Sequence, residues 1–101
     1  METPGSRALM IIRLLKKLSE DERMNAWHLA LYWAMLEVWL DSGRNDVVRI
    51  TRQQLMKQAH ISSLVTYHKY LRELVTLRYV DYLPSYNHYA GSKIIFLNLP
   101  D

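Results

Sequence analysis

The sequence contains no cysteine and only three glycines and three prolines in 101 residues. The absence of cysteine excludes disulfide bonds, thiolate metal ligands and cysteine nucleophiles, and it fits a reducing cytoplasm. So few glycines and prolines exclude collagen-like and proline-rich chains. Long apolar runs are also missing, because the most apolar segment, residues 26–40, is interrupted by His28 and Glu37 and is shorter than the roughly 20 residues of a membrane span. We therefore expect a cytoplasmic protein without a membrane-spanning or export segment.

Half of the residues are hydrophobic and 23% are charged, which is the balance of a globular domain. The length fits one domain rather than two. The net charge of +3 is unevenly distributed, since residues 47–80 hold six basic residues and Glu73 as the one acidic residue. Such a segment is either an ordinary solvated surface or a surface that faces phosphates, and charge alone does not separate the two.

Two helices are predicted in the N-terminal part. Apolar residues three and four apart indicate a helix over residues 6–18, and a capping box from Ser19 to Glu22 predicts a second helix over 20–41 that stops at Gly43. The second helix is apolar nearly all round, so it must be covered nearly all round. Either two copies form a homodimer through residues 6–41, or the first helix folds back and buries the second within a monomer. The sequence favours the homodimer, and His28 is expected to be a hydrogen-bonded core residue.

The remaining sequence predicts short elements. These are a strand over 47–50, a helix over 52–59 capped by Thr51, a tight connection at 60–62, a helix over 64–77 capped by Ser63, and strands over 79–83 and 93–99 joined by a loop. The last strand is apolar on both faces, which places it in the middle of a small sheet. We therefore predict a mostly helical α+β fold with a three-stranded antiparallel sheet. It is expected to be one domain, with residues 1–19 as a helical extension and 20–101 as the core.

From residue 24 onward the chain resembles a winged helix-turn-helix domain. The resemblance rests on residues 49–63, on Leu64-Val-Thr-Tyr-His-Lys-Tyr-Leu-Arg-Glu-Leu, and on Tyr79-Val-Asp-Tyr. It is similar to small winged-helix proteins of bacterial mobile elements and to N-terminal domains of phage replication initiators. His60 and Arg78 depart from the family, because they stand where it often has glycine.

The resemblance implies sequence-specific binding of double-stranded DNA, by a transcriptional regulator or a DNA-binding accessory protein of a mobile element. Alternatives are a protein–protein interaction module and the DNA-binding domain of a replication initiator. No catalytic arrangement, metal-ligand spacing or phosphate loop can be named, so no enzyme activity, cofactor, metal or small-molecule ligand is expected.

The implied DNA contacts fall into three groups. At the start of the helix over 64–77, Ser63, Thr66 and Lys69 could reach base edges beside Val65 and His68, and Arg72 could reach a phosphate. For Ser62 and Ser63, helix capping alone explains the residues equally well. The other two groups are the start of the preceding helix, with Thr51 and Arg52, and the wing, with Tyr86, Asn87, His88 and Lys93. Packing of the wing loop on its own sheet is the competing interpretation for its aromatic residues.

Overall fold

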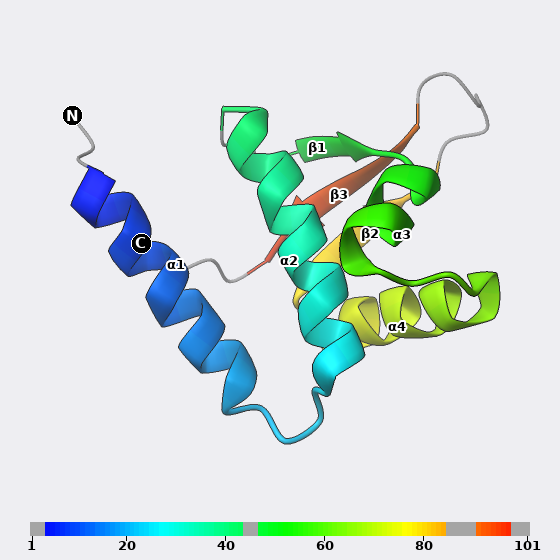
Figure 1. Cartoon of the computed structure of the whole chain (residues 1–101), viewed down its shortest axis with the longest axis horizontal. Coiled ribbons are helices and arrows are strands. Elements are labelled where there is room, and N and C mark those ends of the chain that lie inside the picture. The colour runs from blue at the N-terminus through cyan, green and yellow to red at the C-terminus, as the bar shows by residue number, and fades with distance from the viewer. Residues whose placement is uncertain (1–3, 44–46, 85–90, 98–101) are drawn as a thin grey trace.

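The computed structural model describes residues 4–43, 47–84 and 91–97 (Figure 1). It is an α+β fold in which helices predominate, as predicted. The elements in chain order are α1 (Pro4–Ser19), α2 (Ala26–Asp41), β1 (Val47–Ile50), α3 (Arg52–Ala59), α4 (Leu64–Thr76), β2 (Val80–Leu83) and β3 (Ser92–Phe96).

The sheet has the order β1-β3-β2, with both pairs antiparallel. The prediction that the last strand lies in the middle is therefore confirmed, and Ile94 at its centre is fully buried. This strand is shorter than predicted, because it ends at Phe96 and the Leu97 N–H turns to the Tyr79 carbonyl (3.0 Å). The predicted residues 98 and 99 lie outside the described part of the chain.

The predicted start of α2 is wrong. The helix begins at Ala26 rather than Glu20, and its N-cap is Asn25, whose side-chain oxygen accepts hydrogen bonds from the Trp27 and His28 amides. Ser19 does not cap it, because the Ser19 hydroxyl donates back to the Lys16 carbonyl of α1 (2.9 Å). Between the two helices, Asp21 accepts hydrogen bonds from Arg23 and from the distant Tyr79 hydroxyl, which holds this segment as a non-helical turn.

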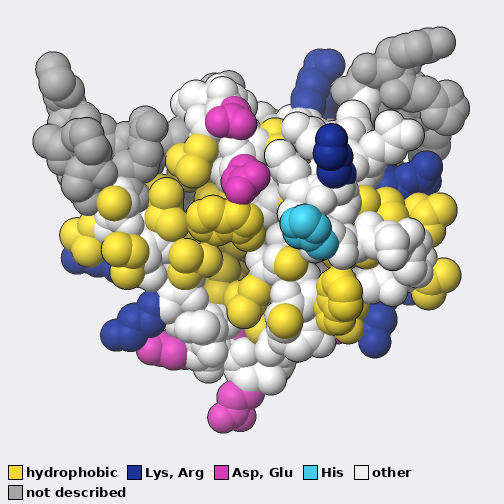
Figure 2. All heavy atoms as spheres, viewed as in Figure 1, with side chains coloured by type: hydrophobic (Ala, Val, Ile, Leu, Met, Phe, Trp, Pro, Cys, Tyr) yellow, Lys and Arg dark blue, Asp and Glu magenta, His cyan; other side chains and the backbone are white. Residues whose placement is uncertain are grey.

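Helix α2 lies between α1 on one side and the sheet, α3 and α4 on the other (Figure 1). From α1, Met10, Leu14 and Leu18 are buried, so much of the apolar surface of α2 is covered within one chain. Large apolar side chains still face solvent, and Figure 2 shows hydrophobic groups gathered over α1 and the adjoining face of α2. These exposed residues include Leu9, Ile12, Trp27 and Trp33. None of the helices in the described ranges is long and apolar enough to cross a membrane.

The two residues that depart from the winged-helix pattern both adopt the left-handed conformation. His60 has φ 59° at the end of α3, and Arg78 has φ 68° after α4. In each case the next amide reaches five residues back, from Ile61 to Met56 and from Tyr79 to Leu74. These are the hydrogen bonds of a Schellman helix end, which satisfies terminal carbonyls and offsets the strain of a non-glycine residue.

Candidate nucleic-acid interface

Helix α4 presents a buried face and an exposed cationic face. Tyr67, Tyr70, Leu71 and Leu74 are buried, at the three- and four-residue spacings that line one face of a helix. On the outer face Val65 is 80% exposed, and Lys69 and Arg72 are exposed beyond it. The Lys69 ammonium lies over the Tyr70 ring, 5.2 Å from its centroid. The outer face therefore offers two cations and one apolar contact along successive turns.

The caps of α3 and α4 form as predicted. The Thr51 hydroxyl accepts from the Gln54 amide (3.1 Å), and the Ser63 hydroxyl accepts from the Thr66 amide (3.3 Å). Ser63 thus serves the helix end, which was its competing interpretation, while Ser62 beside it is exposed. Thr66 is half-buried rather than fully outward, so it lies on the flank of the outer face.

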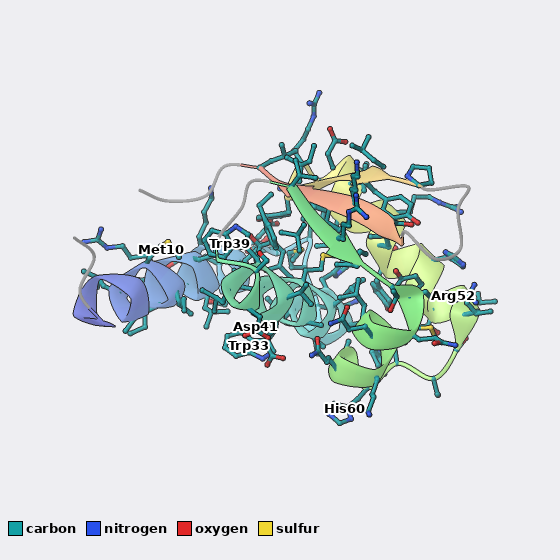
Figure 3. All side chains as sticks on the ribbon, turned by 90° about the horizontal axis from the view of Figure 1, so that it is seen from above. Met10, Trp33, Trp39, Asp41, Arg52 and His60 are labelled. Carbon is teal, nitrogen blue, oxygen red and sulfur yellow. The ribbon has the colours of Figure 1, made fainter. Side chains whose placement is uncertain are left out.

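Arg52 lies at the start of α3, beside the first turns of α4. Burial raises the pKa of Tyr67 to about 12, and the positive charge of Arg52 acts against that rise. The Arg52 guanidinium is therefore within electrostatic reach of α4 at Tyr67. Its side chain is exposed and points away from the body of the molecule, on the side opposite α1 (Figure 3).

A groove of about 290 Å³ runs between α4 and β2. Leu71 and Val75 supply apolar contact, His68 and Arg72 supply basic groups, and Tyr82 borders the groove from the strand. Imidazole and guanidinium groups beside apolar carbon suit an anion carried on a less polar body, as a phosphate is carried on a sugar. The sequence alone did not identify Tyr82, because only the tertiary structure brings β2 against this flank of α4.

Lys93, which the sequence assigned to a wing, lies apart from this groove. It is exposed on β3 and pairs in register with Arg49 of β1 and Leu83 of β2. Ile94, the next residue, faces the core, so Lys93 and Arg49 lie together on the outer face of the sheet, away from the helices. The structure therefore groups Lys93 with Arg49, which the site prediction left out, rather than with Lys69 and Arg72.

The remaining predicted wing residues, Tyr86, Asn87 and His88, lie outside the described residues.

The Glu73 side chain is turned from α4 toward α2. Its carboxylate lies 3.0 Å from Nε2 of His28 at the N-terminus of α2. His28 is 1% exposed and hydrogen-bonded, which confirms its predicted place in the core. Glu73 is the one acidic residue of 47–80, and its half-exposed carboxylate is paired with His28 at the flank of α4.

Across 4–43, 47–84 and 91–97, the structure contains no cluster of three or more His, Asp or Glu side chains that could hold a metal ion. The site therefore consists of cations, hydroxyls and apolar groups, which can bind an anionic surface. Comparison of the chain with family models, with curated proteins and with solved structures found no match.

Proposed function

We propose that this protein is a winged helix-turn-helix protein that binds double-stranded DNA sequence-specifically through α4. The observation that carries the proposal is the outer face of α4, which is exposed and basic, and whose one acidic neighbour, Glu73, is engaged by His28 of α2. The order of elements supports it, since a short helix, a tight left-handed connection, a second helix and a hairpin in a β1-β3-β2 sheet are typical of this family.

In the proposed complex α4 enters the major groove, which is wide enough to admit a helix. Lys69 donates to guanine acceptors, and Val65 contacts a thymine methyl. Arg72 and His68 bind a phosphate of the bordering strand over the groove beside β2, and Arg52 binds another phosphate. The other candidate contacts to DNA are hydroxyl groups, those of Ser62, Ser63, Thr51 and Thr66.

The cellular role we propose is that of a transcriptional regulator or a mobile-element DNA-binding accessory protein in the bacterial cytoplasm. This role rests on the sequence resemblance. DNA binding itself rests on the basic face of α4 as well, so the two parts of the proposal are tested separately.

The first test is the salt dependence of binding to a fluorescent duplex, measured by anisotropy. The two phosphate-binding arginines, Arg52 and Arg72, predict that log K falls with log salt concentration with a slope of about −2. Arg52→Ala should reduce this slope by about one. Arg13→Ala is the matched control, because Arg13 is an exposed arginine on α1, on the far side of α2. Salt-independent binding, or equal effects of the two substitutions, contradicts the proposal.

The second test separates base reading from phosphate binding. Selection of bound sequences from a random duplex pool should yield a preferred site for the wild-type protein. Lys69→Ala should change that preference at one position, while Arg52→Ala should weaken all sequences about equally. An unchanged selected site with Lys69→Ala would remove Lys69 from base reading.

We also propose that two copies associate through α1 and α2, so that a dimer can bind two half-sites about 34 Å apart. The support is the exposed apolar surface that includes Ile12 and Trp33 (Figure 2). Sedimentation equilibrium should give twice the chain mass for the wild-type protein and the single mass for Trp33→Glu. A wild-type protein with the mass of one chain at high concentration contradicts this association.

A further inference from the structure

The N-terminus of α2 is hydrogen-bonded to the middle of α4 through a bridging histidine. Nδ1 of His28 accepts the Asn25 backbone N–H (2.9 Å), and Nε2 lies 3.0 Å from Oε1 of Glu73. Because an amide N–H can only donate, Nδ1 carries no proton and the neutral ring has its proton on Nε2. His28 therefore donates to the Glu73 carboxylate while it completes the capping box of α2.

Aromatic and amide contacts also join α2 to α4 one turn earlier on α4. The Tyr70 ring meets His28 edge-on, with centroids 4.7 Å apart, and stacks with Trp27 at 6.3 Å. Nδ2 of Asn25 donates to the Tyr70 hydroxyl (3.4 Å). Two successive turns of α4, at Tyr70 and Glu73, are thus fixed against α2.

The direction of the Glu73 side chain matters because of its neighbours. Glu73 lies four residues after Lys69, a spacing at which opposite charges on a helix pair, and it directly follows Arg72. In the structure the Glu73 carboxylate meets His28 instead, and the Lys69 ammonium lies over the Tyr70 ring. Among the described residues, the Glu73 carboxylate thus pairs with His28 and not with the cations that the proposed function assigns to DNA.

We propose that His28 is a positioning residue for DNA binding, because it holds the Glu73 carboxylate against α2 and leaves Lys69 and Arg72 free to contact DNA. This inference rests on the proposed function. It adds that a core residue with no DNA contact of its own sets the charge of the recognition surface.

The size of the effect follows from counterion release. A Glu73 carboxylate freed from His28 pairs with Lys69 and cancels about one positive charge on the outer face. One phosphate contact changes the slope of log K against log salt by about 0.9, which is at most about eightfold in affinity at 0.1 M salt. The effect disappears toward 1 M salt.

The experiment compares Glu73→Asp, Glu73→Gln and the wild-type protein by duplex anisotropy at 0.1 M salt. Aspartate keeps the charge on a shorter side chain that no longer reaches His28, whereas glutamine keeps the length and loses the charge. We expect Glu73→Asp to bind about three- to eightfold more weakly and Glu73→Gln to stay within about twofold of wild type. Equal binding by wild type and Glu73→Asp overturns the inference.

His28→Leu, alone and combined with Glu73→Gln, gives an independent readout. Loss of His28 should weaken binding, and the second substitution should restore it, because the freed carboxylate is then absent. A merely structural role of His28 predicts no rescue, and that result overturns the inference. Circular dichroism checks that each variant folds, and if His28→Leu is unfolded, the two Glu73 variants decide the question.

Failure of the proposed function has a different signature. If the wild-type protein binds no duplex in a salt-dependent manner, the proposed function falls and this inference falls with it. If the wild-type protein binds and the Glu73 and His28 variants follow no such pattern, DNA binding stands and only the positioning role is lost.

Discussion

Removal of the Tyr32 hydroxyl should stabilise the protein. Tyr32 is fully buried, and its hydroxyl has no hydrogen-bond partner within the described part of the chain. A buried hydroxyl without a partner costs about 1–3 kcal/mol. Its ring packs edge-on against Phe96 (5.5 Å) and Tyr79 (6.2 Å), and phenylalanine preserves these contacts. After allowance for the small void left by one oxygen, we expect Tyr32→Phe to gain about 1 kcal/mol and to raise Tm by about 4–8 °C.

The assay is thermal and urea unfolding followed by circular dichroism, with Tyr79→Phe as the matched control. Tyr79 loses the same single atom in the same cluster of rings, but its hydroxyl donates to Asp21 (2.5 Å). The two substitutions should therefore change the free energy of unfolding with opposite signs. A loss of about 1 kcal/mol or more with Tyr32→Phe would mean that the hydroxyl is paired, and it would refute the reasoning.

Alkaline pH should increase the difference in stability between Tyr32→Phe and the wild-type protein. Burial raises the pKa of Tyr32 above its ordinary value of 10.0. The stability that depends on a neutral Tyr32 is therefore complete below pH 10 and is lost as pH rises above it, by at most about 1.4 kcal/mol per pH unit. The advantage of Tyr32→Phe over wild type should grow between pH 10 and 11.

Two further predictions concern other parts of the fold. Hydrogen bonds from the Arg23 side chain and then from Tyr79 hold the pKa of Asp21 well below its ordinary value of 3.8, so the stability that depends on the ionised Asp21 is complete above about pH 4 and is lost as pH falls below that. The free energy of unfolding of Asp21→Asn should therefore depend less on pH in acid than that of the wild-type protein. Identical acid profiles of the two proteins would contradict this. Gly91→Ala should destabilise the protein by about 1–3 kcal/mol, because φ is +70° and a Cβ would lie 2.7 Å from the Ile50 carbonyl oxygen. Gly43→Ala should cost less, because Gly43 is also at positive φ but faces open space. Urea unfolding that ranks the two variants the other way would be inconsistent with this packing.

The caps and the centre of the sheet could be predicted because they depend on neighbours in sequence. Thr51 and Ser63 each accept a hydrogen bond from the amide three residues ahead, and the two-sided apolar pattern of residues 94–97 identifies a central strand. The start of α2 could not be predicted in this way. Ser19 matched a local capping pattern, but the contacts of Asn25 with Tyr70 and of His28 with Glu73, far along the chain, place the helix start at Asn25.

Local pattern by itself determined the helical periods, the helix stops and the concentration of positive charge in residues 47–80. Only the tertiary structure decided which way those charges face. Glu73 meets His28, 45 residues away, and Lys93 lies beside Arg49 because strand register places it there. The physical reason is that caps and amphipathic faces are fixed by contacts within one helical turn, whereas the direction of a flanking side chain depends on which element packs against it.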